Sequence, residues 1–557
     1  MRRVAAIALS LAACAPAWKQ LPHDEPFQRA TPPRLHRIPA RATLSDWWDK
    51  TVSSTVSPLA QTVSPARYID RLTGGRPALD VNAFGQVPDS AWFENRITRR
   101  GLTPEQVAAG SGVGHGPADG PLVVVSGKLE GSTPGMVVRD SDGTIWFVKF
   151  DPPAHPELST GAEVVAARLL DAAGYHVPDI VIIKVEVGRF ELAADAHRRN
   201  KYNARVRMKP RDLTTLLSNL NPDAQGRLRA LFSRSVPGRP IGPFSYRGIR
   251  QDDPNDLIPH ERRRSLRGLW VLSAWFNNTD TRRSNTLDTF IVEDETRQLG
   301  YLRHYLIDFG DALGASGDRV KYIGEGYEGQ VDWAEMGKRY LGLGLAYPYW
   351  LPVQRSPYRA VGVFEADVFD PARWAPGFPN AAFDEATALD TFWGASIVAR
   401  FSRDHIEAAV SAGQYRDAEV AAILAEVLMK RREKMLRYVF ESMLPLDDPE
   451  VKRRYELSMT DLAVGAGLVA RASYSWQVRW NRTGRGDRVL ARGAGPSPAV
   501  DLRQPIRDAL DSDRSAFADD PFLTVRFRRK GHPAAVEVHL RVAGSRVVPV
   551  ALHREVD

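Results

Sequence analysis

The sequence predicts an α+β protein: an antiparallel β region, then a mainly helical region, then a small antiparallel β domain. Three observations support this prediction. Short apolar strands separated by Gly- and Asp-containing turns begin near residue 120. Apolar residues at helical spacing dominate residues 404–443. Strict alternation of apolar and polar residues then appears beyond residue 470, which is typical of strands with one face buried.

The composition is that of a globular protein, with 43% hydrophobic and 25% charged residues in 557. A chain of this length has room for more than one domain. The net charge of +8 comes mainly from arginines spread along the chain, a distribution that favours a solvated surface over a nucleic-acid site. Because no zinc finger or aromatic–basic repeat accompanies them, we expect no nucleic-acid partner.

The N-terminus carries the only cysteine, Cys14. A single cysteine excludes an intrachain disulfide and a cysteine-based metal site. Arg2 and Arg3 precede an apolar run of about ten residues, as in a secretory signal that is too short to cross a bilayer as a helix. The sequence therefore predicts a signal peptide over residues 1–14.

Residues 11–14, Leu-Ala-Ala-Cys, resemble the lipobox of bacterial lipoproteins. The resemblance implies that Cys14 is lipidated, becomes the mature N-terminus and attaches the chain to a membrane. Ala15 in place of Asp implies sorting to the outer membrane, facing the periplasm or the surface. The alternative is an ordinary cleaved signal with an incidental cysteine. The expected location is the bacterial cell envelope.

Residues 15–65 are rich in Pro, Ser and Thr, which predicts an extended tether. Residues 66–119 follow as an N-terminal extension. They contain the pair Trp92-Phe93 in a polar stretch, and we expect these aromatics to fill a core rather than to bind a ligand.

Residues 120–209 predict five strands with one helix after the third. The strands are expected at 122–126, 136–138, 144–150, 177–187 and 204–208. A Gly-rich turn joins the first two. The helix begins near Ser159, and its apolar residues recur at helical spacing up to Gly174.

Residues 210–469 predict a mainly helical, loop-rich region. An apolar helix near 266–275 leads into a polar loop, and an apolar strand at 301–307 follows. His260 and Glu261 are adjacent and do not share a helix face, which favours buried polar packing over a metal site. Residues 470–557 complete the chain as the C-terminal β domain.

Five polar residues follow one another along the chain in an order that can be compared with known families. Lys149 ends the third strand, Glu163 lies on the following helix, Asp280 and Asn285 are five residues apart, and Asp308 precedes Phe-Gly. This order resembles the protein-kinase-like superfamily in its atypical branches: HipA-type kinases, phosphatidylinositol kinases and CotH-type secreted kinases. Residues 75–445 also resemble bacterial lipoproteins, a likeness that implies no activity.

The kinase resemblance implies a two-lobed domain, with an antiparallel β N-lobe over 120–209 and a mainly helical C-lobe over 210–469. It implies that Lys149 binds the nucleotide phosphates and is held by Glu163. The turn containing Gly131, Ser132 and Gly135 would offer backbone N–H groups to the phosphates.

In the second half of the site, the resemblance implies that Asp280 is the catalytic residue beside the acceptor hydroxyl. Asn285 and Asp308 would supply oxygen ligands to Mg²⁺ or Mn²⁺ bound with ATP. The loop has Asn278-Thr279 where typical protein kinases have His-Arg, which favours the atypical branches.

Three hypotheses remain open at the level of sequence. The chain is a phosphotransferase acting on a cell-envelope substrate, a catalytically inactive kinase-like protein that binds or scaffolds a partner, or a hydrolase using Asp280 and Asp308 around a metal. ATP is scarce outside the cytoplasmic membrane, which is an argument for the second hypothesis, the catalytically inactive protein. The first predicts that five residues converge within one cleft between the two lobes: Lys149, Glu163, Asp280, Asn285 and Asp308.

Overall fold

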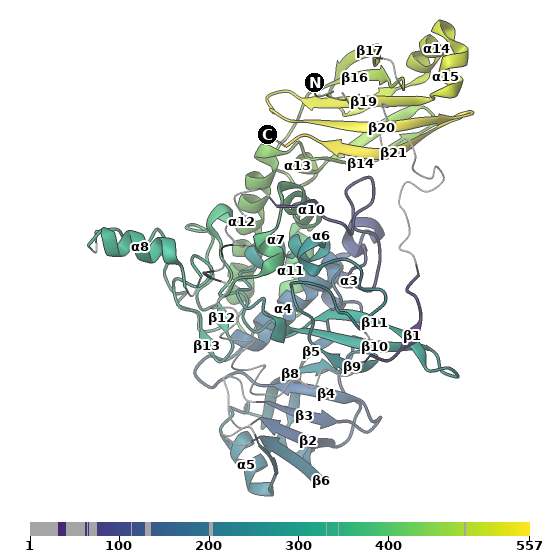
Figure 1. Ribbon diagram of the computed structural model, residues 1–557. Helices are drawn as coiled ribbons and strands as arrows, with labels where there is room; N and C mark the ends of the chain where they lie inside the picture. The colour runs from purple at the N-terminus through teal and green to yellow at the C-terminus, as the bar shows by residue number, and fades with distance from the viewer. Residues whose placement is uncertain are drawn as a thin grey trace, which may run out of the picture. The chain divides into compact units, whose positions relative to one another are not determined.

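The computed structural model describes residues 32–39, 62–63, 65, 75–112, 114–128, 135–199, 204–329, 331–343, 345–483 and 486–556. The chain forms two compact units. The large unit comprises Ala30–Asp80 and Val87–Tyr438, and the C-terminal unit comprises Val81–Gln86 and Val439–Asp557. The fold is α+β, and most neighbouring strands run antiparallel (Figure 1).

A seven-stranded sheet in the large unit has the order β5-β8-β4-β3-β2-β6-β7. Its strands are β2 Leu122–Lys128, β3 Gly135–Arg139, β4 Ile145–Lys149, β5 Ile180–Glu186, β6 Phe190–Arg199, β7 Arg205–Arg207 and β8 Arg227–Arg234. Only β2 and β6 pair in parallel. The five predicted strands are present, and β6 and β8 are additional.

β8 corrects the expectation of helices and loops from residue 210 onward. It lies between β4 and β5 and pairs antiparallel with both. Leu228, Ala230, Leu231 and Phe232 are all buried, because a central strand is covered on both faces. Such a strand lacks a simple period-two pattern, which is why the sequence did not indicate it. Helix α5, Pro210–Ser218, does follow the prediction.

Helix α4, Leu158–Ala173, packs beside this sheet and is buried along its whole length. Its start is fixed by Asp151, whose carboxylate accepts the backbone N–H groups of Ser159 and Thr160 at 3.0 and 2.9 Å. This satisfies two donors that a helix N-terminus otherwise leaves unpaired. The predicted start near Ser159 is confirmed to within one residue.

The end of α4 allows a direct test of packing. Gly174 has φ +125°, and a Cβ there would lie 2.0 Å from the carbonyl oxygen of Glu94. We expect Gly174→Ala to lower the free energy of unfolding by about 2 kcal/mol or more. Gly188→Ala is the matched control, because a Cβ at that position meets nothing within 4 Å. Denaturant melts that are equal for both variants would contradict this account.

A second sheet has the order β1-β11-β10-β9. Its strands are β1 His36–Arg37, β9 Arg239–Gly242, β10 Thr286–Asp294 and β11 Leu299–Leu306. β1 lies inside the predicted tether, 15–65, and pairs with β11. The His36 ring also contacts Phe290 and Asp253, so backbone and side-chain contacts hold the strand there.

Helices make up much of the remainder of the large unit. They are α3 Pro104–Ala109, α6 Arg264–Arg267, α7 Leu269–Trp275, α8 Trp333–Leu341, α9 Ala381–Asp384, α10 Ala388–Val398, α11 Arg403–Ser411 and α12 Ala418–Ser442. The sequence pattern of α12 predicts an apolar core face made of Val420, Ile423, Leu424, Val427 and Leu428. Val420, Leu424 and Leu428 are buried, whereas Ile423 and Val427 are partly exposed. Within the described residues, no helix is both long and apolar enough to cross a membrane.

The C-terminal unit holds two antiparallel sheets, β14-β15-β18 and β17-β16-β19-β20-β21. Its elements are β14 Leu446–Lys452, β15 Glu456–Asp461, α13 Leu462–Gly465, β16 Tyr474–Trp480, β17 Arg488–Gly495, β18 Ala499–Asp501, α14 Arg503–Ser512, α15 Arg514–Asp519, β19 Phe522–Arg529, β20 Ala535–Ala543 and β21 Arg546–Arg554. The longest segment of the unit begins at Val439, whereas the alternation in sequence suggested 470. Leu446 and Leu457, before that boundary, share its core with Val478 and Trp480.

Candidate active site

Three charged side chains from distant parts of the large unit meet at the end of β4. The ammonium of Lys149 lies 2.8 Å from both carboxylate oxygens of Glu163 on α4. It also lies 2.9 Å from Oδ1 of Asp308, which follows β11. The structure thus brings together three of the residues that the sequence singled out, 159 positions apart at the extremes.

Glu163 is placed by the way α4 is anchored. Asp151 caps the helix start and is itself paired with Arg229 from β8, at 2.9 Å. The Glu163 side chain is only 3% exposed, so its carboxylate depends on Lys149 for compensation. Gly310 adjoins this contact: a Cβ there would come within 2.9 Å of Ser159 Oγ. A glycine therefore lets the turn after Asp308 lie against α4.

The electrostatics favour a charged lysine. Burial alone would lower the pKa of Lys149, but the carboxylates of Glu163 and Asp308 outweigh it and raise that pKa. Burial raises the pKa of Glu163, and the ammonium of Lys149 opposes this. The Lys149 side chain is 26% exposed and that of Asp308 is 57% exposed. A positive and a negative group are therefore presented side by side to solvent.

The β10–β11 hairpin connects the predicted catalytic loop to Asp308. Thr286 pairs with Leu306, and the backbone N–H of Ile307 donates to the carbonyl of Asn285 at 3.0 Å. This register places Asn285 beside the strand end that carries Asp308. The side-chain amide of Asn285 donates to the carbonyl of Asp280 at 2.8 Å, which closes the loop.

The carboxylate of Asp280 is paired with an arginine. Arg282 contacts both of its oxygens, with Nη2 at 2.8 Å from Oδ2. Burial tends to lower the pKa of Arg282, but its bond to Asp280 and the negative charges of Asp280, Asp311 and Asp308 raise it. The pair is partly exposed, so Arg282 orients the Asp280 carboxylate at the surface of the site.

A buried triad that the sequence patterns did not indicate supports the same turn. Lys321 is fully buried and lies 2.9 Å from Asp311 and 2.6 Å from the Thr279 hydroxyl. Thr279 also donates to Asp311 at 2.7 Å. The triad ties the turn after Asp308 to the loop before Asp280. Asp311 could have been found from its position directly after Asp-Phe-Gly, whereas no sequence motif near Lys321 indicates its role.

The backbone at Asp308 is unusual, with φ +60°. A left-handed conformation at a non-glycine residue costs energy and is held only where surrounding contacts impose it. Here the contacts of Asp308 with Lys149 and the packing of Gly310 impose it. The conformation turns the carboxylate away from the strand and toward β4.

The Gly-rich turn is described only in part. Gly135 begins β3 and pairs with Lys149 across β3 and β4, so the end of the turn adjoins the lysine. A Cβ at Gly135 would lie 2.7 Å from the carbonyl of Val148, which accounts for the glycine. Gly131 and Ser132 lie outside the described residues, as does Cys14.

The side-chain oxygens of Asp308, beside Lys149, and of Asn285, before β10, could hold a magnesium or manganese ion that arrives with a nucleotide. Mg²⁺ in such sites is held by one or two protein oxygens, with phosphates and water completing the shell. Asp308 and Asn285 are donors of that kind. Among the described residues no group of three or more His, Cys, Asp or Glu could hold a metal by itself. The hydrolase hypothesis requires Asp280 and Asp308 to gather without Lys149, whereas Lys149 lies 2.9 Å from Asp308.

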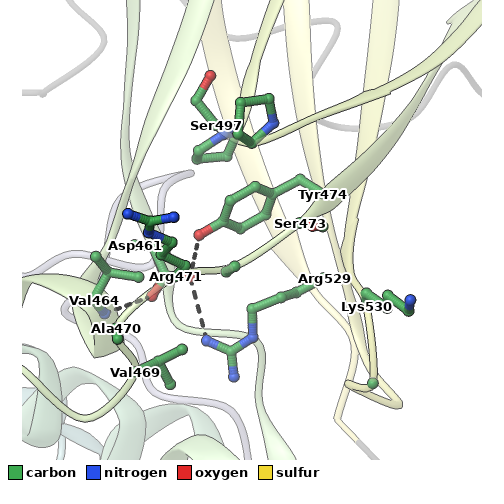
Figure 2. A pocket seen from close by; sticks show the side chains of 14 residues that line it. Asp461, Val464, Val469, Ala470, Arg471, Ser473, Tyr474, Ser497, Arg529 and Lys530 are labelled. Atoms are coloured by element: carbon green, nitrogen blue, oxygen red, sulfur yellow. Dashed lines mark hydrogen bonds and ion pairs between the residues drawn. The ribbon is translucent and has the colours of Figure 1, made fainter.

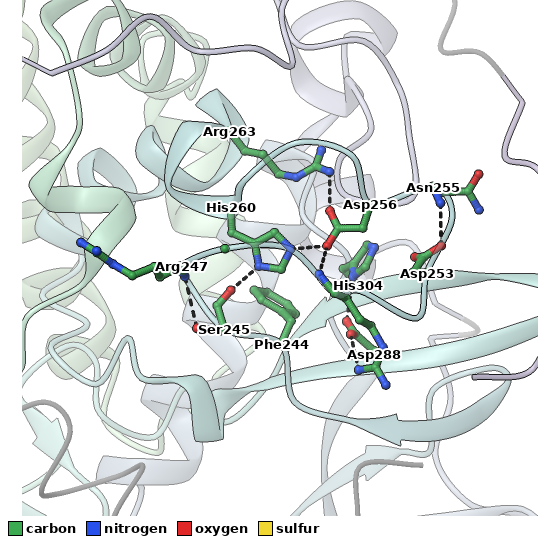
Figure 3. Close-up of polar contacts among 12 residues, drawn as sticks. Phe244, Ser245, Arg247, Asp253, Asn255, Asp256, His260, Arg263, Asp288 and His304 are labelled. Atoms are coloured by element: carbon green, nitrogen blue, oxygen red, sulfur yellow. Dashed lines mark hydrogen bonds and ion pairs between the residues drawn. The ribbon is translucent and has the colours of Figure 1, made fainter. Parts of the chain in front are cut away.

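A second polar cluster in the large unit surrounds His260 (Figure 3). His260 Nε2 lies 2.6 Å from Asp256, and His304 Nδ1 lies 2.7 Å from Asp288. Trp92 stacks on His304 at 3.5 Å between ring centroids. Burial would raise the pKa of Asp256, but His260 and Arg263 lower it to about 2.

All the rings of this cluster are buried, and its charges are internally paired. The expectation of buried polar packing at His260 is confirmed. Phe93 is likewise fully buried, so the Trp-Phe pair of the N-terminal extension fills the core as predicted.

The C-terminal unit contains a cavity of about 940 Å³ beside β15, β16 and β19 (Figure 2). Asp461 accepts from the Tyr474 hydroxyl at 2.8 Å and from Arg529 at 3.2 Å. Arg471 and Lys530 also line it. The volume suits a small ligand or a peptide side chain.

In sequence comparisons, no protein-family model and no curated protein matches the chain. Two solved structures of the Golgi casein kinase are similar, both at a TM-score of 0.26. The one with Mn/ADP bound is 10% identical and covers 58% of this chain and 72% of its own. The other is 11% identical and covers 70% and 90%, respectively.

Proposed function

We propose that this chain is a kinase-like phosphotransferase that uses ATP with Mg²⁺ or Mn²⁺. One observation carries the proposal: the Lys149 ammonium bridges a buried Glu163 on the helix after its strand and an exposed Asp308 before Phe-Gly. Phosphoryl transfer in kinases needs a lysine held by a glutamate and an aspartate that holds metal. The three residues meet in that combination here.

Each residue has a defined task in this proposal. Lys149 would bind the phosphates, and Glu163 holds the ammonium in place through two 2.8 Å contacts. Asp308 and Asn285 would hold the metal ion, which neutralises phosphate charge when bound. Asp280 would accept the proton of the acceptor hydroxyl once that hydroxyl displaces part of its contact with Arg282.

We also propose that the chain is an exported lipoprotein attached to a membrane of the cell envelope through Cys14. This rests on the lipobox-like residues 11–14 and on Cys14 being the only cysteine. The substrate is then an envelope protein, lipid or glycan that carries a hydroxyl group.

The proposal is tested with the chain lacking residues 1–14, a stretch that lies outside the described residues. It is incubated with γ-labelled ATP, Mg²⁺ or Mn²⁺ and an envelope extract, beside Asp308→Asn. We expect label transfer by the unmodified chain and loss of transfer in the variant. Asp142→Asn, an exposed carboxylate in the β3–β4 turn, is the matched control and should retain activity. Absence of nucleotide binding in calorimetry would overturn the proposal.

The cavity of the C-terminal unit favours one alternative, a catalytically inactive protein that binds a partner. Its wall carries Arg471, Arg529 and Lys530, with one carboxylate, Asp461, already engaged by Arg529. An anionic ligand bound there by a chain that binds no nucleotide would support this second function.

A further inference from the structure

Helix α8 and the residues after it present apolar side chains to solvent. Trp333 and Met336 on the helix are about half exposed. Beyond them, exposed fractions lie between 75% and 90% for Tyr340, Leu341, Leu343, Leu345 and Tyr347. Large exposed apolar patches on soluble proteins mark interaction sites. We call residues 333–343 and 345–351 the apolar projection. Helix α8 stands away from the other elements of its unit (Figure 1).

The base of the apolar projection is firmly attached. The guanidinium of Arg373 lies 3.4 Å from the centroid of the Tyr349 ring. The indole N–H of Trp350 donates to Glu328 at 3.1 Å, and Val353 is buried. The exposure of the tip is therefore a property of a held segment rather than of an unanchored loop.

The backbone conformation at the exposed tip is unfavourable for the leucine that adopts it. Leu343 has φ +48°, a left-handed conformation that favours glycine and is unfavourable for a leucine. At 90% exposure its side chain gains no packing within the unit in return. Burial of this side chain in an apolar environment outside the unit would offset the cost of the backbone conformation.

The charges around the tip identify the kind of environment. From Trp333 to Phe364 the sequence has four basic residues and one acidic residue, Glu335, which lies 2.6 Å from Lys338. The basic residues are Lys338, Arg339, Arg355 and Arg359. Arg339 contacts Glu328, whereas Arg355 and Arg359 are exposed. Trp and Tyr at the edges of an apolar tip, with basic residues behind them, are typical of segments that enter the interface of an anionic membrane. Two copies of the chain would instead bring like charges together.

We propose that the apolar projection inserts its tip into the interfacial region of an anionic lipid bilayer. It is a second attachment that depends neither on the lipidation of Cys14 nor on the nucleotide site. The inserted residues are Tyr340, Leu341, Leu343, Leu345 and Tyr347.

The test uses the chain lacking residues 1–14, which contains no cysteine. Leu343→Cys is labelled with an environment-sensitive dye and mixed with vesicles of phosphatidylcholine and phosphatidylglycerol (3:1). We expect dye emission to rise at least two-fold and to be quenched by brominated acyl chains. Leu257→Cys is the matched control, because Leu257 is 77% exposed and lies outside the projection. Its dye should not respond. No response at position 343, or an equal one at 257, overturns the proposal.

A second measurement removes the apolar side chains without adding charge. The triple variant Leu341→Ser, Leu343→Ser, Leu345→Ser should bind the same vesicles at least ten-fold more weakly in co-sedimentation. Its thermal unfolding should match that of the unmodified chain, because these side chains are exposed. Vesicle binding that survives the triple variant, or lipid-free dimerisation that the variant abolishes, would overturn membrane insertion; the latter would assign the tip to a second copy.

Discussion

Replacing Lys149 with methionine is expected to reduce phosphotransfer by about 10³-fold in kcat/KM, because positive charge held ready beside the transferred phosphoryl group supplies much of the rate enhancement in this chemistry. Methionine keeps the length and apolar stem of lysine and removes the ammonium that bridges Glu163 and Asp308. The buried Glu163 can then take up a proton, since burial already raises its pKa. The fold is expected to persist.

The control for this prediction is Lys184→Met. Lys184 lies on β5 of the same sheet but is exposed, so its loss should leave kcat/KM unchanged. Steady-state kinetics on both variants, with circular dichroism to verify folding, give the comparison. A Lys149→Met protein with activity within three-fold of the unmodified chain would remove Lys149 from the site.

The largest expected effect on stability comes from Asp390. Its carboxylate is fully buried and binds two arginines, Arg264 at 2.8 Å and Arg267 at 3.0 Å. It also accepts from Thr387 at the start of α10. Burial would raise the pKa of Asp390, but Arg264 and Arg267 lower it, so the group is charged. Asp390→Ala would remove the buried carboxylate that both guanidinium groups share, although Arg267 keeps its contact with Glu385 at 3.2 Å. The substitution should cost about 3–5 kcal/mol.

Glu433→Ala provides the matched control. Glu433 also binds an arginine, Arg437 at 2.7 Å, but both side chains are about half exposed. Removing an exposed pair is expected to cost about 0.5 kcal/mol or less. Hydrogen exchange during denaturant titration separates the large unit from the C-terminal unit. Equal losses of stability in the two variants would show that the Asp390 network is not a major support of the large unit.

Local sequence signals were sufficient for half of the candidate site. Lys149 at a strand end and Glu163 on the next helix are close in sequence, so strand and helix periodicity place them on adjoining elements. Asp308 was predicted from its position after an apolar strand. Its direct contact with Lys149 depends on how separate segments pack, which periodicity does not report.

The parts that the sequence did not predict depend on long-range pairing. β8 was missed because its side chains are buried on both faces, and β1 was missed because a strand of two residues carries no alternation pattern. The engagement of Asp280 by Arg282 depends on a loop conformation that spacing alone does not determine. Lys321 reaches Asp311 through a turn without a motif.

The position of β8 in the sheet affects the order in which the strands can pair during synthesis. Lys149 pairs with Leu231, so one edge of β4 has no partner until that later segment has been synthesised. An unpaired strand edge can recruit another chain. A nascent chain that ends before residue 227 would therefore be prone to aggregate, and chaperones that hold extended polypeptides would be needed most at that stage of synthesis.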